Sequence, residues 1–194
     1  MAQQLSLFRE DDRFLVDEPS GRIAYYPGVL TPAEAETLFE TLLEEAPWSS
    51  ETMWMYDRMV DVPRLVARYD ASDPKVPPPL RSALERVQTV LGERFNSIGL
   101  NYYRDQSDSV AWHSDHIEEL VPLPTIALLS LGSTRRMQLR TKKRPRRTFS
   151  IDLDPGSLFV MSGHSQQFWE HTIPKLTQPS SPRISAAFRL RRET

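Results

Sequence analysis

Residues 99–103, which read Gly99-Leu100-Asn101-Tyr102-Tyr103, are the first of seven short β-type runs in the chain. The others lie at 125–131, 137–141, 148–153, 157–161, 169–173 and 184–190, with polar turns between them. Strands at such regular spacing must pair with one another to bury their apolar faces. The pattern therefore predicts a closed or double-sheet β architecture, of which the jelly roll is one solution.

Two helices are predicted before this β region. The first begins with Thr31 as N-cap, Pro32 at the first helical position and Glu34 to complete a capping box. Apolar residues then recur at helical spacing until Pro47. A second helical pattern runs from about residue 80 to 95, and residues 62–69 between the helices alternate like a strand. We therefore expect an α+β fold, with the N-terminal helices packed on one outer face of the β architecture.

The composition of the chain is that of one ordinary globular domain. Its 194 residues are 39% hydrophobic and 26% charged, and we expect a single domain over 1–194. There is no cysteine, so a metal site must use His, Asp or Glu. We find no leader-like or membrane-spanning segment, and we expect a cytoplasmic protein without a membrane partner.

A possible metal site begins in the stretch Trp112-His113-Ser114-Asp115. Residues i and i+2 of an extended segment project from the same face, so His113 and Asp115 can both bind one metal ion. His171 lies 56 residues beyond Asp115 (171 − 115), in another predicted strand. Two histidines and one carboxylate leave coordination positions open, which suits non-haem Fe(II). Taken alone, these residues could equally be two partly buried histidines and a turn carboxylate.

The last predicted strand adds two cations. Arg183 and Arg189 are six residues apart and therefore share one face of that strand. A guanidinium group is the best bidentate partner for a carboxylate, so either residue could hold an organic acid near the metal.

At this point the sequence resembles the AlkB-like Fe(II)/2-oxoglutarate-dependent dioxygenases, which repair alkylated nucleic acids. The matching segments span about two thirds of the chain. They are Pro63-Arg64-Leu65, Phe95-Asn96-Ser97, Asn101-Tyr102-Tyr103-Arg104, Asp108-Ser109-Val110, Trp112-His113-Ser114-Asp115, Leu129-Ser130-Leu131-Gly132, Trp169-Glu170-His171 and Pro182-Arg183 through Phe188-Arg189. The resemblance implies a double-stranded β-helix. Residues 1–95 would include the helices and a nucleotide-recognition lid, and 96–194 would form the catalytic jelly-roll core.

The resemblance also implies roles for individual residues. Fe(II) would be held by the catalytic residues His113, Asp115 and His171, with Arg189 nearby. Arg183 would pair with the distal carboxylate of the co-substrate 2-oxoglutarate. The other co-substrate residues would be Asn101, Tyr103, Ser185 and Arg189. Without the resemblance, Tyr103 would pass for a core aromatic residue and Asn101 for a turn former.

The reaction implied by the resemblance is oxidative demethylation of N-alkylated bases in DNA or RNA, in response to DNA damage. Fe(II) and O2 act together with 2-oxoglutarate, which is decarboxylated to succinate. The hydroxylated methyl group of the base leaves as formaldehyde.

The nucleic-acid partner would meet a basic run. Eight Arg and Lys residues fall within 135–147, which suggests a phosphate-binding edge that includes Arg140. A charged hairpin that discourages edge pairing would look the same. Trp54, Met55 and Tyr56 are candidates to contact the base, although they could also be packing residues. We expect a monomer that acts on single-stranded DNA or RNA, with duplex DNA as the alternative.

The chain departs from the family pattern in two places. His116 and Ile117 follow Asp115, where an acidic residue two positions beyond the metal carboxylate is common. Ser185 and Ala187 replace a usual Asn and Thr. These changes make the alkyl lesion uncertain but leave the ligand set intact. His116 could compete as a ligand, but a neighbour of Asp115 in an extended segment points to the opposite face.

Two other functions stay open at this point. The same oxygenase core could hydroxylate or demethylate a protein or a small molecule. Alternatively, the chain could be a non-catalytic module that binds damaged strands, although the complete set of ligand types argues against a pure binder.

Overall fold

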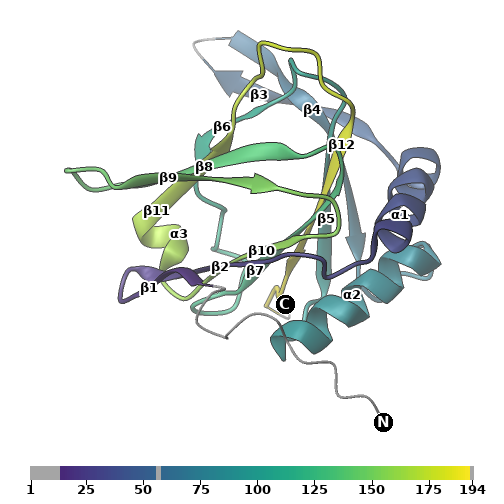
Figure 1. Ribbon diagram of the computed structural model, residues 1–194, viewed down its shortest axis with the longest axis horizontal. Coiled ribbons are helices and arrows are strands. Elements are labelled where there is room, and N and C mark those ends of the chain that lie inside the picture. The colour runs from purple at the N-terminus through teal and green to yellow at the C-terminus, as the bar shows by residue number, and fades with distance from the viewer. Residues whose placement is uncertain (1–13, 56–57, 193–194) are drawn as a thin grey trace.

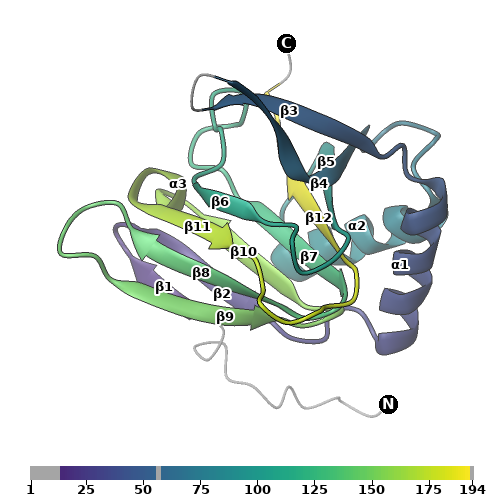
Figure 2. The ribbon, with the colours of Figure 1, turned by 90° about the horizontal axis from the view of Figure 1, so that it is seen from above.

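The computed structural model describes residues 14–55 and 58–192, and the side chains of these residues except those in 53–61. Two antiparallel sheets form the body of the fold (Figures 1 and 2). The larger sheet has the strand order β1-β2-β10-β7-β12-β5-β4-β3, and the smaller has the order β6-β11-β8-β9. This is the double-sheet architecture that the strand spacing predicted.

All seven predicted β-type runs are strands, with ends that differ from the prediction by at most two residues. They are β5 (Ser97–Tyr103), β7 (Ile126–Gly132), β8 (Arg135–Thr141), β9 (Thr148–Leu153), β10 (Leu158–Ser162), β11 (Trp169–Ile173) and β12 (Arg183–Arg189). The predicted strand at 62–69 lies within the longer β4 (Arg58–Asp70).

The central strands of the larger sheet are buried on both faces. In β7, Ala127, Leu129 and Leu131 pack in the core beneath the helices, whereas Ile126 and Leu128 pack in the core between the sheets. This alternation explains why the whole strand is apolar, because neither face meets water. In β5 and β12 the numbering is reversed: odd-numbered residues such as Tyr103 and Ala187 face the space between the sheets, and even-numbered ones pack beneath the helices.

The two predicted helices, α1 (Pro32–Glu45) and α2 (Pro78–Leu91), lie together beside the larger sheet (Figure 1). At the start of α1, Thr31 and Glu34 form the expected capping box. The second helix ends at Leu91, four residues earlier than predicted, and Gly92 caps it with a φ of +67°. Phe95 is nevertheless buried, with its ring centroid 6.2 Å from that of Phe188.

Some elements were not predicted. They are β1 (Phe14–Glu18), β2 (Gly21–Tyr26), β3 (Ser49–Met55), β6 (Val110–His113) and the four-residue helix α3 (Ser165–Phe168). Because β2 pairs with β10, residues before 95 also contribute to the jelly-roll sheet. The strands after residue 96 are therefore not the whole of that core. No helix in the described part of the chain is both long and apolar enough to span a membrane.

Candidate metal centre

The three predicted ligands converge between the two sheets. Strands β6 and β11 are antiparallel neighbours that place His113 directly opposite His171. Asp115 Oδ1 lies 3.7 Å from His113 Nε2 and 3.6 Å from His171 Nε2. The ligand atoms all lie within 4.8 Å of one another, and no other such His and carboxylate cluster occurs among the described residues.

Neighbouring groups hold these ligands in place. His113 Nδ1 is 2.9 Å from the Ala111 carbonyl oxygen, so Nδ1 is the protonated nitrogen and Nε2 keeps its lone pair. The backbone N–H of Asp115 donates to Gln166 Oε1 at 2.8 Å, and Ser114 Oγ donates to the Trp169 carbonyl at 2.8 Å. Gln166 was missed in the sequence, because nothing local marks a four-residue helix as the support of a distant ligand.

The charges at the site favour metal binding. Burial, together with the neighbouring His113, lowers the pKa of His171 to about 4. His171 is therefore neutral at pH 7, as a ligand must be. Burial acts to raise the pKa of Asp115, but Arg189 and the two histidines outweigh it and hold this pKa below its usual value. The carboxylate is therefore ionised.

Arg183 lies in the interior, and part of its guanidinium group has no hydrogen-bond partner among the described residues. Its side chain is buried, and Nη2 donates to Ser130 Oγ at 3.0 Å. Neither Nε nor Nη1 has a hydrogen-bond partner among the described residues. Burial lowers the pKa of Arg183 to about 10, which still leaves it charged at neutral pH. A buried cation with unpaired donors fits a carboxylate ligand.

The other predicted co-substrate residues lie on the same interior face. Register places Tyr103 opposite Arg183 and Asn101 opposite Ser185. Asn101 Oδ1 accepts a hydrogen bond from Arg64 Nε at 2.7 Å, so its amide NH2 group is the part that can donate to a ligand. Arg189 forms an ion pair with Asp115, with Nε 3.0 Å from Oδ2. The structure thus places the predicted metal-binding residues and the predicted 2-oxoglutarate-binding residues in the space between the two sheets.

These residues fit iron and 2-oxoglutarate. Two imidazole nitrogens and one carboxylate oxygen are the donor set of non-haem Fe(II) sites with open positions. The His113 side chain is 37% exposed, whereas those of His171 and Asp115 are 6% and 8% exposed. The site is therefore accessible to solvent at His113 and buried at His171 and Asp115.

His116 is not part of the cluster. Its side chain is 97% exposed, and its Nδ1 lies 3.7 Å from Glu118 Oε2. The expectation that it points away from the ligands is confirmed.

Of the predicted substrate residues, only Arg140 has a described side chain. Tyr56 and the side chain of Trp54 lie outside the described part of the structure. Arg140 pairs with Glu170, Nε to Oε1 at 2.9 Å, and its Cζ lies 3.9 Å above the Trp112 ring centroid. Because its neighbour Leu139 is the residue opposite His171, Arg140 projects from the other face of the smaller sheet.

The basic run is only partly a surface feature. Residues 142–147 form an exposed hairpin tip, but Arg136 pairs with Asp152 and Arg147 with Glu18. The prediction was wrong for Arg135, which is 1% exposed. Arg135, Met137 and Leu139 alternate along β8 and face the interior, so Arg135 cannot contribute to a phosphate-binding edge.

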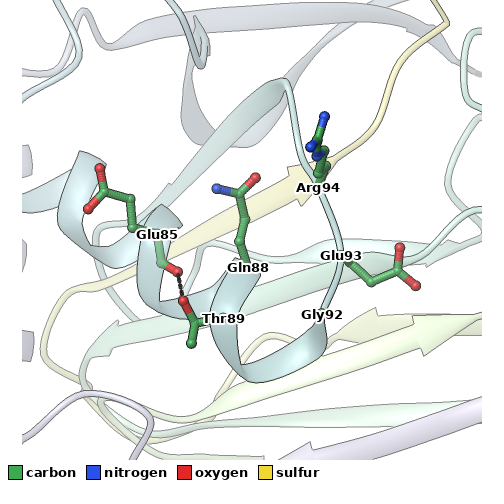
Figure 3. A pocket seen from close by; sticks show the side chains of 6 residues that line it. All are labelled: Glu85, Gln88, Thr89, Gly92, Glu93 and Arg94. Carbon is green, nitrogen blue, oxygen red and sulfur yellow. Dashed lines mark hydrogen bonds between the residues drawn. The ribbon is translucent and has the colours of Figure 1, made fainter.

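A surface depression of about 480 Å³ lies at the C-terminal end of α2, away from this site (Figure 3). It is lined by Glu85, Gln88, Thr89, Gly92, Glu93 and Arg94. Thr89 Oγ1 donates to the Glu85 carbonyl within it at 2.8 Å. The depression contains none of the predicted site residues.

Comparison with known proteins agrees with the geometry. Residues 22–192 match the family model of the 2OG-Fe(II) oxygenase superfamily. The human alpha-ketoglutarate-dependent dioxygenase alkB homolog 3 is 34% identical over 192 residues, which are 88% of this chain and 67% of that protein. The DNA oxidative demethylase ALKBH2 of Arabidopsis thaliana is 31% identical, over 87% of this chain and 66% of that protein. The chain thus spans about two thirds of the length of these relatives.

Solved structures support the fold. OsALKBH1 aligns with a TM-score of 0.62 and 13% identity, covering 90% of this chain and 99% of that chain. A prolyl hydroxylase from Trichoplax adhaerens aligns with a TM-score of 0.64 and 9% identity, covering 87% and 83%. The chain therefore belongs to the 2OG-Fe(II) oxygenase superfamily, as an AlkB-like dioxygenase that uses Fe(II), 2-oxoglutarate and O2.

Proposed function

We propose that the protein oxidatively demethylates N-alkylated bases in DNA or RNA as part of alkylation damage repair. The observation that carries the proposal is the His113, Asp115 and His171 cluster, which shares one interior space with the unpaired donors of Arg183. The names of the relatives, among them a DNA oxidative demethylase that is 31% identical, supply the substrate class.

The residues of the chain divide the work of the reaction. His113, Asp115 and His171 would hold Fe(II), and Arg183 would fix the distal carboxylate of 2-oxoglutarate. Bound Fe(II) supplies O2 activation, which the protein cannot provide itself. In the balanced reaction, 2-oxoglutarate and O2 give succinate and CO2 while an N-methyl group becomes N-hydroxymethyl. This group then leaves as formaldehyde and restores the N–H of the base.

The base would enter from the side of His113, the most exposed of the three ligands. The exposed basic hairpin at 142–147 would supply phosphate contacts, although several cations of the run are already paired with acids. We therefore expect binding that is mainly electrostatic and weakens as salt increases.

A panel of singly methylated oligonucleotides, both DNA and RNA and both single-stranded and duplex, tests the proposal. Loss of a methyl mass from the oligonucleotide and release of formaldehyde are measured with Fe(II), 2-oxoglutarate and O2. We expect turnover of at least one N-methylated base by the wild-type protein and none by His171→Ala.

His116→Ala is the matched control, because His116 is exposed and outside the cluster. It should keep wild-type turnover. Succinate formation without demethylation of any oligonucleotide would contradict the proposal and point to a protein or small-molecule substrate.

A further inference from the structure

Arg135 is buried, and it belongs neither to the metal cluster nor to the protein surface. It is 1% exposed and faces the interior from β8. No acidic side chain pairs with it among the described residues, and its Nε has no partner. Burying an arginine without a counter-charge is costly, so its other contacts must offset a large desolvation cost.

Three backbone carbonyls accept hydrogen bonds from Arg135. Nη1 donates to the Asp105 carbonyl at 3.2 Å, and Nη2 donates to those of Asp108 at 3.0 Å and Pro174 at 2.7 Å. Asp105 and Asp108 belong to the loop that leads from β5 to β6. Pro174 directly follows β11, the strand of His171. One guanidinium group thus forms hydrogen bonds to the segment after Tyr103 and to the segment after His171.

Tyr103 lies close to both buried arginines. Its ring centroid is 5.6 Å from Arg135 Cζ and 5.2 Å from Arg183 Cζ, and the tyrosine is 4% exposed. Each contact has the geometry of a cation–π interaction. The Tyr103 ring thus contacts both arginines and links Arg135 to Arg183.

We propose that Arg135 is a positioning residue of the 2-oxoglutarate site, which holds Tyr103 and the β5–β6 loop so that the free donors of Arg183 face the distal carboxylate. The proposal rests on Arg183 as the partner of that carboxylate. It does not depend on the substrate that is oxidised. Among the described residues, Arg135 has no hydrogen bond or ion pair with the metal ligands, and it would act on the co-substrate through Tyr103.

The shape of the guanidinium group explains why arginine occupies this position. Its planar fork can reach carbonyls of two separate segments at once, whereas the single nitrogen of lysine cannot span them. Arg136, the next residue on the strand, points outward and pairs with Asp152, Nε to Oδ1 at 2.7 Å. It is therefore a matched control for the loss of one positive charge from β8.

The test compares two ligands that differ by the distal carboxylate. Calorimetry measures the binding of 2-oxoglutarate and of 2-oxobutanoate, which lacks that carboxylate, to the Mn(II)-loaded protein without nucleic acid. We expect Arg135→Gln to weaken 2-oxoglutarate binding by about tenfold, the size of one charge-assisted hydrogen bond, and to change 2-oxobutanoate binding by less than about threefold. Arg136→Gln should leave both unchanged.

A purely structural role predicts a different result. Equal weakening of both ligands, or wild-type affinity for both, would overturn the proposal. Arg135→Lys serves as the second variant if Arg135→Gln does not fold. It keeps the charge but loses the fork, and a selective loss of 2-oxoglutarate affinity is again expected. The readout needs no demethylation, so its failure is distinct from a failure of the proposed function.

Discussion

Arg183 brings five N–H donors into the interior, and only Nη2 meets an acceptor among the described residues. The unpaired donors are tolerated because a bound carboxylate can accept hydrogen bonds from them. Arg183→Gln removes the charge and the fork, and we expect the KM for 2-oxoglutarate to rise by about 10- to 100-fold, which corresponds to about 1.5–3 kcal/mol.

The measurement is steady-state succinate formation at varied 2-oxoglutarate. Arg192→Gln is the control, because Arg192 donates its Nε to the Leu120 carbonyl, outside the site. An unchanged KM for Arg183→Gln would show that another group holds the distal carboxylate.

Asp108 gives a pH-dependent prediction. Its side chain is almost fully buried and accepts three hydrogen bonds from Arg104, from the backbone N–H, Nε and Nη2. Burial raises the pKa of Asp108, but these bonds outweigh it and the net pKa is lowered. A carboxyl whose folded pKa is depressed stabilises the fold above its unfolded pKa of about 4 and loses this effect as pH falls through the folded value.

We therefore expect Asp108→Asn to lower the free energy of unfolding by about 1–3 kcal/mol at pH 7, a range reduced because Arg104 is half exposed. The difference from wild type should shrink only below about pH 4. Urea unfolding from pH 3 to 8 measures it. Asp152→Asn, which breaks an exposed pair, should change little. A difference that is constant across this range would refute the electrostatic explanation.

At the residue scale, the sequence was enough to single out the three side chains that cluster between the sheets, because each has a distinctive chemistry and a family spacing. The sequence prediction was wrong for Arg135, because a run of basic residues does not itself show which side chains of the strand face the interior. Met137 and Leu139 at the same parity were the available signal. No sequence signal exposes Gln166, whose contact with Asp115 joins residues 51 positions apart.

Strand patterns were predictable where one or both faces are apolar, as in β7 and β12. The four-residue β6 and α3 are too short to show a period, and their form depends on tertiary packing. In β1 and β2, apolar and polar residues alternate poorly, and β1 lies at the sheet edge. Pairing with β10, far away in the chain, decides that β2 is a strand.

Gly132 ends β7 at a crowded junction of three elements. Its φ is +78°, and a Cβ there would lie 2.6 Å from both the Phe39 ring on α1 and the Pro182 carbonyl before β12. Gly132→Ala should therefore add overpacking to backbone strain and lower the free energy of unfolding by about 2–4 kcal/mol. Because Gly132 pairs with Arg183, 2-oxoglutarate binding should weaken too.

Gly28→Ala separates the two contributions. Gly28 also has positive φ, +63°, but a Cβ there would meet nothing within 4 Å. Gly28→Ala should therefore lower the free energy of unfolding by about 1 kcal/mol, from backbone strain alone. Chemical denaturation of both variants gives the comparison. Equal losses would mean that the contacts of Gly132 with α1 and β12 are unimportant.

For the whole molecule, the ligands join segments that the chain separates widely. His113 and Asp115 come from β6 and the residues after it, and His171 comes from β11, so a metal bound by all three favours the folded state over the unfolded chain. Ligand linkage predicts about 2.7 kcal/mol of added stability when free metal is 100 times its Kd. The unfolding temperature should therefore rise with Mn(II) and rise further with 2-oxoglutarate.

Each part of this prediction has its own control. His171→Ala should abolish the shift from Mn(II), and with it the further shift from 2-oxoglutarate, whereas His116→Ala should retain both. Arg183→Gln should keep the shift from Mn(II) and lose most of that from 2-oxoglutarate, because only the second ligand needs Arg183. Differential scanning fluorimetry at fixed pH measures all four proteins. If His171→Ala keeps the Mn(II) shift, the metal binds elsewhere, and the three residues between the sheets are not its ligands.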